Sequence, residues 1–97
     1  MEMLIREDFE PYLNQSFNIR LPGGGVHAKL VEVKTLGSPF RDGAREPFSL
    51  LFEADTEYGL LNQGSYPLSN SVFEERTLFL VPVGHRENCY QYEAVFN

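Results

Sequence analysis

Residues 77–97 read TLFLVPVGHRENCYQYEAVFN, and this run predicts two β-strands folded back on each other. The first half, Leu78 to Val83, is apolar at every position, which predicts a strand covered on both faces. The second half alternates, with polar Gln91 and Glu93 on one side. The side predicted to face the core carries Tyr90, Tyr92, Ala94 and Phe96. This pattern indicates a core-forming β-hairpin.

The same period of two predicts further strands upstream. Phe17, Ile19 and Leu21 alternate with polar residues, and a Pro-Gly-Gly-Gly turn follows them. The strand predicted over residues 26–35 changes its inward face near Leu30. Such a change indicates either a β-bulge or a strand that crosses from one sheet to another.

Two more strands precede the C-terminal hairpin. One is predicted over residues 48–54, and a shorter one contains Tyr66 and Leu68. Pro67 lies between Tyr66 and Leu68. Since proline cannot donate to a sheet ladder, this shorter strand is predicted at an edge or at a bulge. The core side of the longer strand carries Phe48, Leu50, Phe52 and Ala54.

The one helix signal lies near the N-terminus, where Phe9, Tyr12 and Leu13 share a helical face. Pro11 is tolerated only in the first turn of a helix, so the helix is predicted to begin near Asp8 and to last about two turns. A helix this short is unstable alone and is expected to dock on the sheet.

These elements predict a mainly β protein: an antiparallel sandwich or a partly closed small barrel of about six strands, with a short N-terminal helix. Pattern alone does not separate the two architectures. Residues 1–97 are expected to form a single β domain, because a chain of this length supports only one core. If an edge is open, the strand of residues 17–21 is expected to be the less protected one.

Charge and composition argue against several partners and compartments. The formal charge of −6 and the pI of about 4.8 repel phosphate, so neither nucleic acid nor a membrane is expected as a partner. The N-terminus lacks the basic and apolar segments of a signal peptide, and no apolar run approaches the roughly 20 residues of a membrane span. The lone Cys89 rules out an internal disulfide and favours a reducing compartment. A cytoplasmic location is therefore expected.

Residues able to carry chemistry are present but lack the patterns that catalysis or metal binding requires. His27, His85 and Cys89 do not have the regular spacing of dedicated metal ligands, and no orienting group accompanies a Cys89–His85 pair. The acidic run from Glu53 to Glu57 lacks the turn glycine and terminal glutamate of a calcium loop. We therefore predict no enzyme activity, no catalytic residues, no bound metal and no cofactor.

One loop combines the features of a protein-binding surface. Phe40, Arg41 and Arg45 place an aromatic and two cations close together in an otherwise acidic chain. Phenylalanine and arginine are both frequent anchors in protein interfaces. The sequence therefore predicts protein binding by these three residues, with packing of Phe40 onto the core as the alternative.

Four motifs carry a resemblance to a known family. They are FSLLF at residues 48–52, LNQGSY at 61–66, LFLVPVG at 78–84 and YEAVF at 92–96. Together they resemble a family of small uncharacterised bacterial domains of unknown function, some of which are encoded beside phage-tail-like collar proteins. Pro67 departs from that family's pattern, which has a polar residue after the tyrosine of the second motif.

The preferred hypothesis is a non-catalytic interaction or assembly module, and the resemblance implies an association with phage-tail-like proteins. Its partner would be another protein or a second copy of the chain. The alternative is a small β-barrel whose many aromatic residues bind an apolar small molecule.

Overall fold

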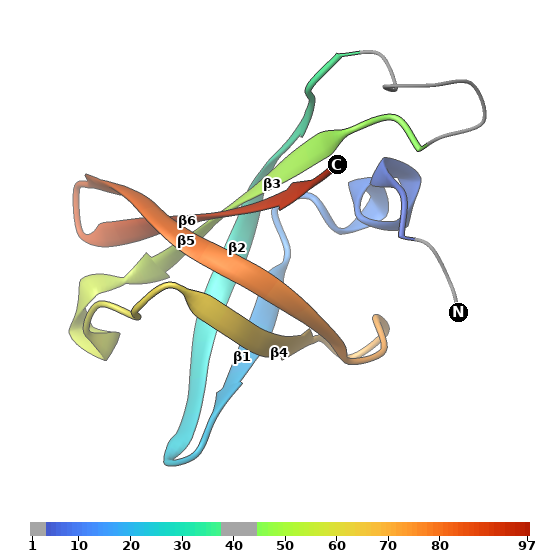
Figure 1. Cartoon of the computed structure of the whole chain (residues 1–97). Helices are drawn as coiled ribbons and strands as arrows, with labels where there is room; N and C mark the ends of the chain where they lie inside the picture. The colour runs from blue at the N-terminus through green and yellow to red at the C-terminus, as the bar shows by residue number, and fades with distance from the viewer. Residues whose placement is uncertain (1–3, 38–44) are drawn as a thin grey trace.

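The computed structural model describes residues 4–37 and 45–97. They form a closed, six-stranded antiparallel β-barrel with the strand order β1-β2-β3-β6-β5-β4, in which β4 pairs back onto β1 (Figure 1). This closure decides for a barrel over a sandwich. The strands are β1 Ser16–Leu21, β2 Gly24–Thr35, β3 Phe48–Asp55, β4 Gly64–Ser69, β5 Arg76–Arg86 and β6 Cys89–Phe96.

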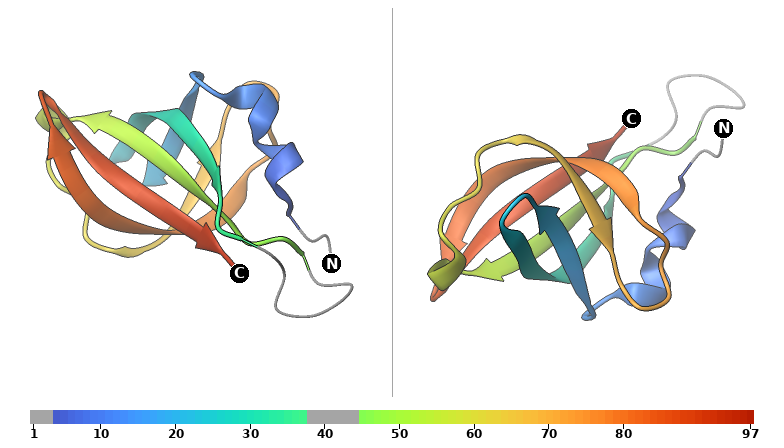
Figure 2. Two further views of the ribbon diagram at one scale, coloured as in Figure 1. Left: turned by 90° about the horizontal axis from the view of Figure 1, so that it is seen from above. Right: turned by 90° about the horizontal axis from the view of Figure 1, so that it is seen from below.

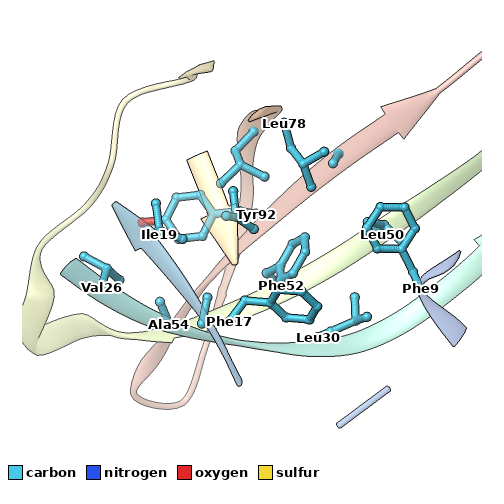
Figure 3. Packing of buried hydrophobic residues seen from close by; sticks show 14 of the residues in the cluster. Phe9, Phe17, Ile19, Val26, Leu30, Leu50, Phe52, Ala54, Leu78 and Tyr92 are labelled. Carbon is cyan, nitrogen blue, oxygen red and sulfur yellow. The ribbon is translucent and has the colours of Figure 1, made fainter. Parts of the chain in front are cut away.

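The core occupies the inside of the barrel, where inward side chains from all six strands meet. Figure 3 shows Ile19, Phe52 and Tyr92, from three different strands, gathered between the ribbons. Alternation places these side chains on one face of each strand, as the period of two predicts. The buried apolar residues are Phe9, Phe17, Ile19, Val26, Ala28, Leu30, Phe48, Leu50, Phe52, Ala54, Leu68, Leu78, Leu80, Tyr92 and Ala94.

The predicted C-terminal hairpin is confirmed as β5 and β6, but the prediction that β5 is covered on both faces is wrong. Leu78 and Leu80 are buried, whereas Phe79 is 53% exposed and Val83 is 51% exposed. A single closed barrel has one interior, and among the described residues no second layer covers the outside of β5. The continuous apolar run therefore places Leu78 and Leu80 in the core and leaves the residues between them on the outside of the barrel.

The change of face predicted in the second strand is confirmed as a β-bulge in β2. Its pairing with β3 shifts register between Leu30 and Glu32, which leaves Val31 as the extra residue. Beyond the bulge, Val33 is partly buried against the core. One inserted residue thus reverses which side of β2 faces inward.

The strand predicted to be less protected, β1, is not an edge strand. It pairs with β2 along its whole length and with β4 through two residue pairs, Asn18 with Ser69 and Ile19 with Leu68. Pro67 adjoins the point where this β1–β4 seam ends. Pro67 pairs with Thr77 of β5 and has no partner residue on β1, so its missing N–H interrupts no pairing on that side. The strand predicted at an edge or a bulge therefore lies between two neighbours, with Pro67 just beyond the short seam.

A short N-terminal helix is confirmed, as two successive 3₁₀ turns: η1 Arg6–Asp8 and η2 Glu10–Tyr12. Phe9, between them, is buried and contacts the ring of Phe73 at 5.2 Å between centroids. Leu13, predicted on the same face, is 43% exposed because the helix ends at Tyr12. The segment lies across one end of the barrel, beside the β4–β5 connection (Figure 2).

A third 3₁₀ turn, η3 Thr56–Tyr58, follows β3. None of the helices found in residues 4–37 and 45–97 has the length and apolarity that crossing a bilayer demands.

Candidate functional site

Three apolar side chains stand exposed on the outside of the β5–β6 hairpin. Phe79 and Val83 of β5 are 53% and 51% exposed, and Val95 of β6 is 49% exposed. Val81 is half-buried and lies opposite Glu93, two residues from Val95. We call Phe79, Val81, Val83 and Val95 the apolar face. Exposed apolar residues that gather in this way mark interaction surfaces more often than scattered ones do.

The sequence of β5 creates the apolar face because this strand is apolar on both sides. Alternate residues fill the core, so the residues between them, Phe79 and Val81, point outward. The register with β6 then shifts between Pro82 and Gly84, which leaves Val83 as the extra residue. Val83 nevertheless continues the outward alternation of Phe79 and Val81, and its side chain is 51% exposed.

Arg45, one of the three residues predicted to bind a partner, is engaged within the domain. Its Nη1 donates to the carbonyl of Leu4 at 2.7 Å, and its Nη2 donates to the carbonyl of Asn97 at 2.8 Å. The guanidinium also lies 5.5 Å from the ring centroid of Phe96. Arg45 thus joins the N-terminal segment to the end of β6.

The other two predicted binding residues, Phe40 and Arg41, lie outside the described residues. The protein binding predicted from the sequence concerns their loop and not the apolar face. The apolar run from Leu78 to Val83 carries the sequence signal of this face, because a strand that is apolar on both sides exposes one of them where no second layer covers it.

The candidate metal ligands and nucleophile are dispersed. His27 lies exposed on β2 beside Tyr58, with 6.4 Å between the ring centroids. His85 lies on β5 beside Tyr90, at 5.3 Å, and Cys89 is half-buried at the start of β6. In the part of the chain that the structure describes, no three His, Cys, Asp or Glu residues come together as a metal site.

Glu53 forms a hydrogen-bonded cluster with Arg86 and Gln91. Only 10% of its side chain is exposed, and its oxygens accept hydrogen bonds from Arg86 at 3.1 and 3.2 Å and from Gln91 at 2.8 Å. The Arg86 guanidinium foremost, with help from Gln91, holds the pKa of Glu53 below its usual range, although partial burial opposes this. A carboxylate held ionised in this way suits a structural role better than that of a general acid.

Gly84 accommodates this cluster. It lies opposite Gln91, and a Cβ at position 84 would come within 2.7 Å of the Gln91 Oε1. The side chain that reaches Glu53 therefore occupies space that any other residue at position 84 would contest. This gives a structural reason for the glycine in the LFLVPVG motif.

The inward-facing aromatic rings contact one another. Phe17 and Phe52 meet edge to face with 5.7 Å between centroids, and Phe9 packs on Phe48 at 6.0 Å.

Two hollows open to solvent, of about 370 and 430 Å³, flank the short seam between β1 and β4.

Comparison with known proteins places the chain in a family whose activity is not described. A family described as a domain of unknown function, DUF6916, matches residues 4–96. No curated protein and no solved structure matches the chain. The expected resemblance to a family of uncharacterised domains is thereby confirmed at this level. Since the match spans nearly every residue, the chain belongs to the DUF6916 family of domains of unknown function.

Proposed function

We propose that this domain is a non-catalytic interaction or assembly module that binds a protein partner, or a second copy of itself, through the apolar face. The supporting observation is the exposure of Phe79, Val83 and Val95 by about half on two neighbouring strands. Phenylalanine is one of the residue types enriched at the centres of protein interfaces. Burying these side chains against a partner removes apolar surface from water, which favours association.

Side chains, rather than a free strand edge, make the contact in this proposal. Every strand has a neighbour on both sides in the closed barrel. A partner strand would have to separate β1 from β4 before it reached unpaired backbone groups. The outer surface of the hairpin is available without that step.

The family resemblance supports a setting for the module. Because some domains of this kind are encoded beside phage-tail-like collar proteins, the module would belong to a bacterial, phage-tail-like assembly. The lone Cys89 favours a reducing compartment, as in the cytoplasm. The net charge of −6 favours a partner that surrounds its apolar contact with basic residues.

The proposal predicts that Phe79→Glu combined with Val95→Glu abolishes self-association or lowers recovery of a bound protein about tenfold or more, since charges would be desolvated in the interface. Native mass spectrometry of the purified protein reports self-association, and affinity capture from the native lysate reports a partner. Val72→Glu is the matched control, because Val72 is 72% exposed but lies on the β4–β5 connection. All variants should melt close to the wild-type temperature, since none of the three residues is in the core.

Equal association by the double variant and the control would remove the apolar face from consideration. An apolar small molecule that co-purifies with the monomer in the same spectra would favour the ligand-binding barrel instead. Loss of binding in the control as well would show that added negative charge, rather than the apolar face, governs the contact.

A further inference from the structure

The larger hollow beside the β1–β4 seam is uncharged. It measures about 430 Å³, within the range of about 300–1,000 Å³ typical of small-molecule sites. None of its lining residues is Lys, Arg, Asp or Glu, although these make up 23% of the chain. The lining residues are Gln15, Ser16, Phe17, Asn18, His27, Ser69, Asn70 and Ser71.

Three of these residues form a row across adjacent strands. Asn18 of β1 pairs with His27 of β2 on one side and with Ser69 of β4 on the other. Residues directly opposite each other in a sheet face the same side. Asn18 alternates with the buried Phe17 and Ile19, so an amide, an imidazole and a hydroxyl all face outward together.

The hydrogen-bonding groups of this row and of the neighbouring Ser71 have no protein partner in the part of the chain that the structure describes. Among the described residues, Asn18, His27, Ser69 and Ser71 make no side-chain hydrogen bond to another protein group. The side-chain amide of Asn70, in contrast, is hydrogen-bonded within the domain. Its Oδ1 accepts from the backbone N–H groups that follow it, at 2.9 and 2.6 Å, and so shapes the connection beside the row.

An aromatic ring stands next to the row. Tyr58 is 44% exposed and meets the His27 ring edge to face, with 6.4 Å between centroids. An exposed tyrosine offers an apolar ring face and a polar tip in one side chain. It can therefore contact the apolar face of a ring whose edges are hydroxylated.

These observations select a ligand class by its chemistry. Amide, imidazole and hydroxyl groups both donate and accept, as the hydroxyl groups of a sugar do. A phosphate or carboxylate ligand finds no lysine or arginine among the lining residues, and the charge of −6 repels it further. A metal or organic cation finds no carboxylate there. We propose that this hollow is a binding site for a neutral saccharide.

The test is a titration of the isotope-labelled full chain with maltose, lactose and N,N′-diacetylchitobiose, followed by backbone amide chemical shifts in NMR. At least one sugar should give saturable shifts confined to the hollow and to Tyr58, with a Kd of about 1 mM, as suits an open site. Glucose and glucuronate are titrated in the same way as a matched pair, and glucuronate should bind more weakly because of its carboxylate. Asn18→Ala and His27→Ala should each raise the Kd about tenfold, whereas Ser65→Ala, on the other hollow, should not.

Absence of saturable shifts with all three sugars overturns the proposal. So do shifts centred outside the hollow, or equal binding by glucose and glucuronate. The spectra of the variants report their folding directly, because amides remote from the substitution keep their positions in a folded domain. The test is independent of the apolar face, and the Phe79 variant should bind the sugar unchanged.

Discussion

At the scale of single residues, Arg45 shows how a side chain that looks available in the sequence is used by the fold. It was predicted to meet a partner, and its guanidinium contacts two backbone carbonyls and the Phe96 ring. A planar group with several donors suits such a junction better than a lysine would. To bind a partner through its guanidinium, Arg45 would have to give up these contacts within the domain.

Arg45→Ala is therefore expected to destabilise the domain by about 1.5–3 kcal/mol, the typical loss for hydrogen bonds to a charged group. Thermal or urea unfolding measures this loss. Arg20→Ala is the control, since Arg20 forms an exposed pair with Glu75 at 3.0 Å and should cost less than about 1 kcal/mol. An Arg45→Ala variant that keeps its stability but loses a captured partner would instead support the original binding hypothesis.

Glu53 predicts a pH dependence. Its pKa is lowered in the folded state by Arg86 and Gln91, so its stabilising contribution is complete above the pKa of an unfolded glutamate, about 4.3. The contribution is lost as the pH falls through the lower folded-state value. Glu53→Gln should thus be less stable than wild type by on the order of 1 kcal/mol at pH 7, and the difference should shrink below about pH 4.

Urea unfolding from pH 7 to pH 2 measures this difference. Glu32→Gln provides the control, because Glu32 is exposed on β2 and has no ion pair among the described residues. A Glu53→Gln difference that stays constant over the whole range would contradict the assignment.

At the scale of elements, the N-terminal segment contacts the barrel through an aromatic cluster, beside the hydrogen bond from Arg45 to Leu4. Phe9 is buried among Phe48, Phe73 and Phe96, at 6.0, 5.2 and 5.6 Å between centroids. Two 3₁₀ turns contribute little stability of their own because they are so short. The aromatic cluster therefore determines whether the segment stays on the end of the barrel.

Phe9→Ala should cost about 3–5 kcal/mol, the usual loss for a buried aromatic ring. Leu13→Ala, one turn further and 43% exposed, should change stability by less than about 0.5 kcal/mol. Chemical denaturation compares the two. Equal, small effects would show that the segment is not part of the cooperative unit.

At the scale of the whole molecule, closure depends on the shortest contact between strands. β1 meets β4 through two residue pairs, whereas β3 and β6 pair along eight residues each. Residues of β1 and β4 line one hollow on either side of this seam. The uncharged row of Asn18, His27 and Ser69 crosses the seam, so one feature of the topology creates both the closure and the candidate sugar site.

The sequence by itself determined the local structure. Alternation identified the strands and most of their inward faces, the change of face near Leu30 indicated the bulge in β2, and the segment around Phe9 was recognised as a short helix. Each of these features depends on neighbouring residues, because strand period, turn chemistry and helix propensity act over a few positions. The mainly β class followed from them.

Only the tertiary structure decided closure, exposure and the candidate sites. The pairing of β1 with β4 and of β3 with β6 joins residues far apart in the chain, and no local pattern encodes it. That pairing gives the barrel a single interior and leaves Phe79 and Val83 outside, although the sequence of β5 is apolar throughout. It also brings Arg45 against Asn97 and aligns Asn18 with Ser69, because contacts between distant segments depend on how the strands close around one core.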